Sequence, residues 1–386
     1  MDFELSEKAI DFRSQVKKFI SENLTTEVIS KMHETGTFND KSFNESLASE
    51  GLLAGAVPGY GDRDPVELYL LFNELEKAGA PYDGLAVTML VAGVINAVGT
   101  EFHHEEVLNK LLSGKHNCCL GYSEPDYGSD VASITTKAEK IGNKWIINGQ
   151  KMWTTMAHES DWVLLLTRTN SEVPKHKGMT MFLVPMNTPG IEIQPVATMA
   201  SERTNATFYD NVEVEDQWRL SEVDDGWSVM GIALALERGV MGGTNPAVPL
   251  LKHVINWAET TSSKNKSLMI NNALMRERIA RTAIINQVGQ LLTLRAAWIA
   301  ATGGMPGVEG SMAKIYASEE YQKVVGWFQQ MAGAEGLLSF GAEDAAASGW
   351  IDYDARHAPV TTIYGGTSEI NRNNIAERHL GLPRSR

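Results

Sequence analysis

The pattern of apolar and polar positions divides the chain into a helical first part, a β-rich middle and a helical last part. In the first part, apolar residues recur at helical spacing among charges, and Asp64-Pro65-Val66-Glu67 combines a capping residue, a first-position proline and an acid, as helix starts do. Leu85 to Val98 is apolar almost all round, which predicts a buried helix. The helices predicted in this part cover 3–24, 64–78, 85–98 and 104–112.

The pattern of apolar and polar residues changes at Asn117, where alternating and β-branched runs replace the helical period. Turn signals separate these runs, including Gly142-Asn143, Asn148-Gly149 and the segment from Asn187 to Gly190. Several short strands with this punctuation predict a small β-barrel or sandwich. The runs are SITTKAEKI, KWIING, DWVLLLTRT, GMTMFLVPM, IEIQPV and ATFYDNVEV.

From Gly226 the helical period returns, and long antiparallel helices of this kind make a bundle. The predicted helices cover 227–258 (as one helix or two), 269–302, 311–333 and 368–379, with a break at Gly303 to Gly307. The expected fold is therefore α+β and multidomain. Its parts are an N-terminal α-helical domain at 1–118, a middle β domain at 119–226 and a C-terminal four-helix bundle at 227–386.

Composition narrows the class of protein. The 386 residues exceed one typical core, which agrees with two or three domains. The net charge of -14 argues against a nucleic-acid partner, because such proteins normally carry a basic footprint. Cys118 and Cys119 are adjacent and form no disulfide framework. With no apolar run long enough to span a bilayer and an acidic N-terminus, the expectation is a cytoplasmic protein without membrane insertion.

The stretch from Leu120 to Thr155 holds the densest group of residues suited to a flat, polar cofactor. Hydroxyl and backbone N–H donors near the edge of a flavin favour its reduced, negatively charged state. The stretch contains YSEPDYGSD at 122–130 and NGQKMWTT at 148–155, and IYGGTSEINR follows at 363–372. The histidines show no metal-ligand spacing, so no metal is expected.

These three blocks, in this order and within a helical–β–helical layout, resemble the acyl-CoA dehydrogenase family of flavoenzymes. The resemblance covers nearly the whole chain. It implies the three-part fold of that family, FAD as cofactor, and α,β-dehydrogenation of an acyl-CoA thioester to the trans-2-enoyl-CoA. It also implies an electron-transfer flavoprotein as the acceptor of the electrons.

The resemblance assigns roles to individual residues. It places Ser123 and Thr155 as donors to the flavin ring, Trp153 against the ring plane, and Ser129 at the CoA arm of the substrate. The alternative for these positions is that Ser, Thr and Trp are routine strand residues, which the presence of all three blocks disfavours. The further cofactor contacts expected in the same way are Tyr122, Gln330, Gly333, Thr367 and Glu369.

One departure from the family concerns the catalytic base, which many members carry directly after the Tyr of the C-terminal block. Here that position is Gly365, which keeps only its backbone N–H for bonding the thioester oxygen. Isovaleryl-CoA and long-chain members carry the base in an E-R pair on the first helix of the last domain, where this chain has Glu237-Arg238. Glu237 is therefore the predicted base and Arg238 a predicted substrate contact.

The residues around Glu237 agree with that role. On a helix, Glu237 shares a face with apolar residues, while Arg238 points about 100° away, since there are about 3.6 residues per turn. A carboxylate on an apolar stripe binds a proton more readily than one in water, as suits a base. The alternative is a structural glutamate paired with a cation from another helix.

A second departure concerns the R-x-x-F-G segment, whose Arg reaches the flavin pyrophosphate of a neighbouring subunit in many members. Residues 256–281 contain no such motif, and the later Q-x-x-G-G-x-G motif is blurred at Gln330 to Gly336. This pattern resembles bacterial members that act on bulky acyl-CoAs such as steroid side chains, some of which form mixed tetramers. A homotetramer with other cations at the pyrophosphate remains the alternative.

Three functional hypotheses follow. The leading one is an active FAD-dependent acyl-CoA dehydrogenase with Glu237 as base. The second is a catalytically silent partner subunit of a heteromeric enzyme. The third is an acyl-CoA oxidase-like member that passes electrons to oxygen.

Overall fold

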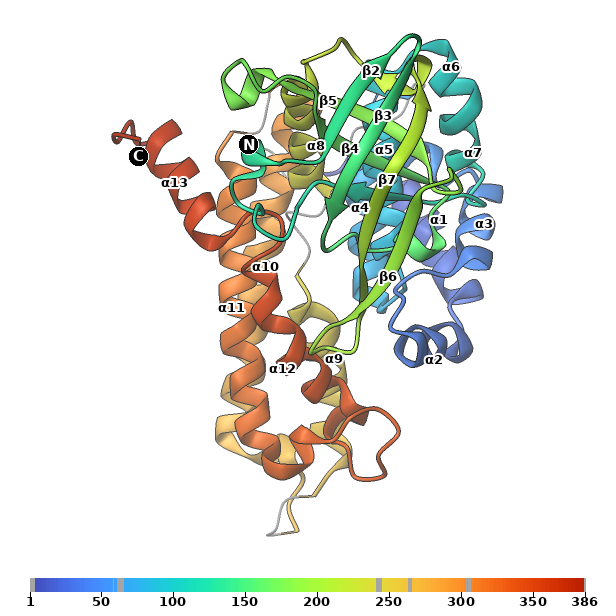
Figure 1. Ribbon diagram of the computed structural model, residues 1–386. Helices are drawn as coiled ribbons and strands as arrows, with labels where there is room; N and C mark the ends of the chain where they lie inside the picture. The colour runs from blue at the N-terminus through green and yellow to red at the C-terminus, as the bar shows by residue number, and fades with distance from the viewer. Residues whose placement is uncertain are drawn as a thin grey trace.

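The structure is a computed structural model that describes residues 4–57, 59–60, 66–240, 245–262, 266–302, 304 and 307–384. Helices of the first part of the chain pack behind a β-sheet, and two long helices at the left of the view extend well past the end of the sheet (Figure 1). The expected three-part fold, helical then β then helical, is confirmed.

The first part of the chain is helical. The predicted buried helix is confirmed as α5 (Asp83–Val98), which buries every residue from Gly84 to Ile95. The predicted Asp64-Pro65 helix start lies outside the described residues, and α4 is described from Val66. Two short helices, α2 and α3, were not predicted. The helices are α1 (Glu7–Asn23), α2 (Thr26–Thr35), α3 (Lys41–Ser49), α4 (Val66–Ala78), α5, α6 (Glu101–His103), a π-helical turn (His104–Leu108) and α7 (Asn109–Leu112).

The middle of the chain forms an eight-stranded sheet. The strand order is β6-β7-β3-β2-β4-β5-β8, and β1 pairs in parallel with β4. Strand β4 is buried on both faces: Leu164 and Leu166 join the core shared with α5, whereas Val163 and Leu165 join a second core. The strands are β1 (Cys118–Gly121), β2 (Lys137–Ile141), β3 (Lys144–Lys151), β4 (Trp162–Arg168), β5 (Met179–Pro185), β6 (Ile191–Ala197), β7 (Arg203–Glu215) and β8 (Arg219–Leu220).

The second core is enclosed by both halves of the sheet. Ile147 of β3 and Val212 of β7 meet Val163 of β4 and Phe182 of β5 in it. The expected barrel-like or sandwich-like arrangement of short strands follows from this shared core, because strands at opposite ends of the order bury their side chains together.

The predicted turn at Asn148-Gly149 is wrong. Both residues lie inside β3, where the pairing with β7 shifts register between Ile147 and Gly149. The extra residue is on β7, at Asn211, which has a φ of +50° and whose backbone N–H donates to Asn148 Oδ1 at 2.8 Å. A glycine inside a strand often marks such a bulge rather than a turn.

The last part of the chain is helical and has its own core. Helices α9 to α12 supply most of that core, and α10 and α11 run side by side (Figure 1). Residues 227–258 form two helices, and α12 was not predicted. The helices are α8 (Gly226–Val240), α9 (Ala247–Thr260), α10 (Ala273–Ala301), α11 (Glu309–Ala332), α12 (Trp350–Thr361) and α13 (Ser368–Arg378).

Helix α12 joins the last part of the chain to the turn between β6 and β7. The Tyr353 hydroxyl donates to Glu202 Oε1 at 2.5 Å, and His357 Nδ1 lies 2.6 Å from the same oxygen. Arg356 donates to the backbone carbonyl of Met199 at 2.9 Å. These contacts fix the helix that leads directly into the Gly365-Gly366 turn.

The space around Gly149 and Gly142 predicts different effects of an alanine substitution at these two positions. A Cβ on Gly149 would lie 2.6 Å from Thr136 Oγ1, whereas one on Gly142 would meet nothing within 4 Å, although both glycines have positive φ. Gly149→Ala therefore adds overpacking, which costs about 1–3 kcal/mol, to the backbone strain that both variants share. We expect a lower urea midpoint for Gly149→Ala than for Gly142→Ala. Equal midpoints would contradict the close packing of Gly149 against Thr136.

Candidate active site

The first two sequence blocks are joined by a hydrogen bond and a buried ion pair. The Met152 N–H donates to the Ser123 carbonyl at 2.9 Å. Lys151 Nζ lies 2.9 Å from Glu124 Oε1, and it also donates to the Tyr122 carbonyl at 3.1 Å. Lys151 is 1% exposed and Glu124 4% exposed, so the pair is shielded from water.

Glu124 is held as a carboxylate by several donors. Its Oε2 accepts from the Thr135 N–H at 2.7 Å and the Thr135 hydroxyl at 2.8 Å, and its Oε1 accepts from the Thr136 N–H at 2.8 Å. Burial alone would raise the pKa of Glu124, but Lys151 and these donors outweigh it and lower that pKa to about 2. Burial lowers the pKa of Lys151 to about 8, against the opposing effect of Glu124.

The residues after β3 turn sharply and expose an aromatic ring. Trp153 has a φ of +63° and is 59% exposed. Beside it, Asn205 holds Thr154 from both sides: the Thr154 N–H donates to the Asn205 carbonyl at 2.8 Å, and Asn205 Nδ2 donates to the Thr154 carbonyl at 3.0 Å. The Thr155 hydroxyl lies 3.2 Å from that of Thr204. Two of the predicted ring-contact residues, Trp153 and Thr155, thus lie on a turn that Asn205 and Thr204 hold by hydrogen bonds.

Glu237 and Gly365 come together although they are far apart in sequence. Glu237 is half-buried on α8, and a Cβ placed on Gly365 would lie 3.8 Å from its Oε1. Tyr122 is electrostatically coupled to Glu237: burial, and then the charge of Glu237, raises the pKa of its phenol. Among the described residues, the buried Tyr122 hydroxyl has no hydrogen-bond partner. Tyr122 of the first block and Gly365 of the C-terminal block therefore both lie in the neighbourhood of Glu237.

Sequence reasoning missed a cation at the same place. Lys314 of α11 donates from Nζ to the Gly366 carbonyl at 2.7 Å, and its Cε lies 4.0 Å from the Cβ position on Gly365. The signal for it was weak, because one lysine in an amphipathic helix normally faces solvent. The buried Lys151 had a better signal, since it shares the parity of the apolar Trp145 and Ile147 along β3.

Other predicted residues lie elsewhere. Gln330 and Gly333, both exposed, are at the far end of α11, and a rise of about 1.5 Å per residue puts Gln330 about 24 Å from Lys314 along the helix. Ser129 is exposed in the loop after the first block. The backbone of Arg238 is part of α8, but its side chain lies outside the described residues.

The C-terminal block begins a helix as predicted. The Thr367 side chain accepts from the Ile370 N–H at 3.2 Å, so Thr367 caps α13. Glu369 is exposed in the first turn of this helix.

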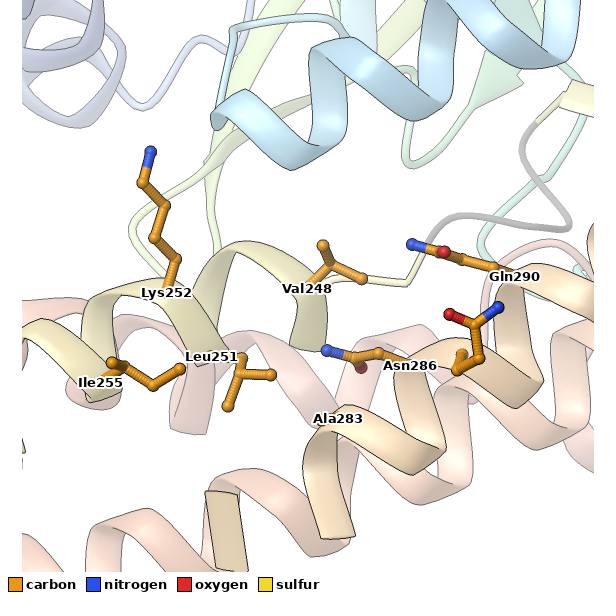
Figure 2. A pocket seen from close by; sticks show the side chains of 8 residues that line it. Val248, Leu251, Lys252, Ile255, Ala283, Asn286 and Gln290 are labelled. Atoms are coloured by element: carbon orange, nitrogen blue, oxygen red, sulfur yellow. The ribbon is translucent and has the colours of Figure 1, made fainter. Parts of the chain in front are cut away.

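A cavity between α9 and α10 is separate from this site (Figure 2). Its volume is about 380 Å³, and none of the predicted catalytic or cofactor residues lines it. The lining residues are Val248, Leu251, Lys252, Ile255, Ala283, Asn286, Gln287 and Gln290.

No helix in the described ranges is long and apolar enough to cross a membrane. Nor do these ranges contain a cluster of three or more His, Cys, Asp or Glu side chains that could hold a metal ion.

Family models cover nearly the whole chain. The acyl-CoA dehydrogenase N-terminal domain matches residues 6–115, the middle domain of the same family matches 119–212, and its C-terminal domain matches 224–380.

Curated relatives carry the same family name. Acyl-CoA dehydrogenase FadE34 of Mycobacterium tuberculosis is 34% identical, with 94% of this chain and 49% of the relative aligned, so this chain spans about half the length of that protein. Acyl-CoA dehydrogenase FadE26 of the same organism is 30% identical, with 89% of this chain and 88% of the relative aligned.

Solved structures agree in fold. The Tcur3481-Tcur3483 steroid ACAD is 28% identical with a TM-score of 0.88, and the ChsE4-ChsE5 complex from Mycobacterium tuberculosis is 26% identical with a TM-score of 0.87. Each comparison covers 100% of both chains.

The buried ion pair leads to a stability prediction. Lys151→Met leaves Glu124 buried without its cation, and breaking one side of a buried pair costs about 3–5 kcal/mol. The double variant Glu124→Gln/Lys151→Met removes both charges and is expected to be more stable than Lys151→Met. Urea unfolding measures both.

The matched control is Lys144→Met, which removes the same type of side chain from the exposed pair with Glu213 on the same strand. Solvent screens that pair, so we expect little change. A loss of stability in Lys144→Met as large as that in Lys151→Met would contradict the special role of the buried pair.

Proposed function

The chain belongs to the acyl-CoA dehydrogenase family, and on that premise we propose that it catalyses FAD-dependent α,β-dehydrogenation of an acyl-CoA thioester with Glu237 as the base. The observation that carries the proposal is the 3.8 Å between Glu237 Oε1 and the Cβ position of Gly365. The position after Tyr364 has no carboxylate of its own, and a carboxylate from α8 reaches it instead.

The residues present fit a flavin. Trp153 offers an exposed ring on a turn held by Asn205, and the hydroxyl of Tyr122 is a buried donor without a protein partner among the described residues. Ser123 and Thr155 would donate to the ring edge from the two blocks that Glu124 and Lys151 join. Gln330, Gly333, Thr367 and Glu369 are proposed for the rest of the cofactor, including that of a neighbouring subunit. When bound, the flavin supplies the acceptor for the hydride that leaves the β-carbon.

The chain's own groups handle the proton and the thioester. Glu237 removes the α-proton, which is weakly acidic and becomes easier to remove when the thioester oxygen is hydrogen-bonded. The Gly365 N–H is the proposed donor to that oxygen, and positive φ at Gly365 and Gly366 gives the turn its shape. Arg238 and Ser129 are proposed substrate contacts, Ser129 for the CoA arm.

The proposed acyl group is bulky. Gly365 has no side chain beside the proposed base, and one structurally similar protein is a steroid ACAD. We propose a steroid side chain or a comparably large acyl group as the substrate class, with an electron-transfer flavoprotein as the acceptor.

The proposed assembly is a homotetramer or a heterotetramer with a related subunit. Ile284 and Leu291, seven residues apart on one face of α10, are 64% and 39% exposed. A similar structure, ChsE4-ChsE5, is a complex of two named components. The second candidate function, a catalytically silent partner subunit, is supported by the missing R-x-x-F-G segment in residues 256–281.

Glu237→Gln tests the base. The variant keeps the shape of the side chain but cannot accept the α-proton, and general base catalysis contributes about 100-fold or more. We expect anaerobic bleaching of the flavin by a bulky acyl-CoA to slow by at least about 100-fold, with the flavin absorption of the purified protein unchanged.

The control is Glu259→Gln on the exposed end of α9, which should bleach at the wild-type rate. If bleaching survives in Glu237→Gln, another group is the base. Wild-type protein without flavin, or with flavin that no acyl-CoA bleaches, would favour the silent subunit. Oxygen consumption coupled to enoyl-CoA formation would identify an oxidase.

A further inference from the structure

Lys314 occupies an unusual position for a lysine. It lies within α11, is 8% exposed, and donates from Nζ to the Gly366 carbonyl at 2.7 Å. Lysine is almost never buried to this extent unless it is paired. Its Cε is 4.0 Å from the Cβ position of Gly365, where Glu237 Oε1 is 3.8 Å away, so the lysine and the proposed base approach the same residue.

The Gly366 carbonyl is held from two sides. Asn371 Nδ2 donates to it at 2.8 Å, in addition to Lys314 Nζ, and Asn371 is 3% exposed. Gly365 and Gly366 have φ of +63° and +80°, and because glycine populates negative φ about as readily, contacts outside the two glycines help to select this conformation. Two donors on one carbonyl provide this support next to the Gly365 N–H.

The acids near Lys314 differ in their surroundings. Glu319 of the same helix makes a two-bond pair with Arg372, at 2.6 and 2.8 Å. Glu369 of α13 is exposed. Glu237 of α8 is half-buried, as Glu319 is, and it is the third acid whose charge acts on Lys314, after Glu319 and Glu369. Burial lowers the pKa of Lys314 to about 8, and these three acids oppose that effect.

Other charged and titratable groups lie on the elements packed against α8. On α5 and β5 the charged residue is Asp83, at the first position of α5. In the first block, burial and then the charge of Glu237 raise the pKa of Tyr122. Helix α4 contributes Glu76, which accepts from the backbone N–H of Asn245, and α10 contributes Arg295, which pairs with Glu309. The segment Lys175–Lys177 lies beside Trp227, at the other end of α8, through His176.

We propose that Lys314 is a positioning residue of the active site, which holds the Gly365-Gly366 turn and favours the carboxylate form of Glu237. The inference rests on the proposed role of Glu237 as base. Lys314 acts through the turn that presents the Gly365 N–H and through its charge.

The charge effect has a definite sign. A cation near a carboxylate stabilises the ionised form, so removing the cation makes the carboxylate harder to deprotonate. The base would then lose its activity at a higher pH as the solution is acidified. Lys314→Met should therefore move the acidic limb of the pH–rate profile upward by about 1 pH unit, the lower end of what an opposite charge does to a carboxyl group.

The experiment compares Lys314→Met and Lys314→Gln with Lys314→Arg, which keeps the charge. Lys323→Met on the same helix is the control, because Lys323 is exposed and pairs with Glu320 at 2.5 Å. The first readout is the rate of anaerobic flavin bleaching against pH. The second needs no activity: hydrogen exchange of the backbone amides in residues 362–371, measured by mass spectrometry.

The expected result is an upward shift of the acidic limb and at least about tenfold faster exchange of residues 362–371 in both neutral variants. Lys314→Arg should restore the position of the limb, and Lys323→Met should match the wild type in both readouts. A merely structural lysine would change exchange and leave the limb in place.

Three outcomes decide between the claims. Coincident pH profiles in wild type and a neutral variant overturn the charge effect, and unchanged exchange overturns the hold on the turn. If no acyl-CoA bleaches the flavin of the wild-type protein, the proposed function is wrong. The hydrogen-exchange measurement alone then decides whether Lys314 holds the turn. If Lys314→Met does not fold, Lys314→Gln, closer in polarity to lysine, supplies the comparison.

Discussion

The arrangement of the candidate site depends on a buried lysine that bonds a carboxylate across two segments of the middle domain. Lys151 ends β3, Glu124 lies in the loop after β1, and the pair with its surrounding threonine donors ties these segments together. Without it, both charges would stand uncompensated in a dry interior, which is far more costly than their absence. The pair thereby helps to fix the positions of the Ser123 backbone and of the exposed Trp153.

Helices from the last domain complete the site. Helix α8 brings Glu237, α11 brings Lys314, and the turn after α12 brings Gly365. Two of these elements are fixed by contacts away from the site. Helix α8 packs against α5, and Tyr353 of α12 donates to Glu202 in the turn between β6 and β7. A site assembled in this way is precise because rigid elements, rather than loops alone, carry its groups.

The absence of a side chain at Gly365 has a physical consequence. It leaves space for a carboxylate from another helix to approach the turn, and it permits the positive φ that the turn adopts. The same position needs support from outside, because glycine brings no side-chain contacts of its own. Lys314 and Asn371 supply that support through the Gly366 carbonyl.

Much of the fold was predictable from local pattern. The continuous apolar runs of α5 and β4 match elements that are buried on all sides, so sequence sufficed there. The pattern failed at Asn148-Gly149, where turn residues serve a bulge, because the extra residue lies on the partner strand β7. It also missed α12, a short helix of mixed polarity whose Ile351 and Ala358 join the core of the last part of the chain while Tyr353 and Arg356 bond the turn between β6 and β7.

The sequence by itself determined the family, since the three family blocks can be recognised in order from their residues alone. It also pointed to Glu237, because the position after Tyr364 is Gly365, which has no carboxylate. Only the tertiary structure decided which groups surround that glutamate. Its helix suggested an apolar stripe, but Lys314 approaches from a different helix 77 positions along the chain. Electrostatic neighbours depend on distance in space, and the spacing of residues along one helix cannot report a cation that another helix supplies.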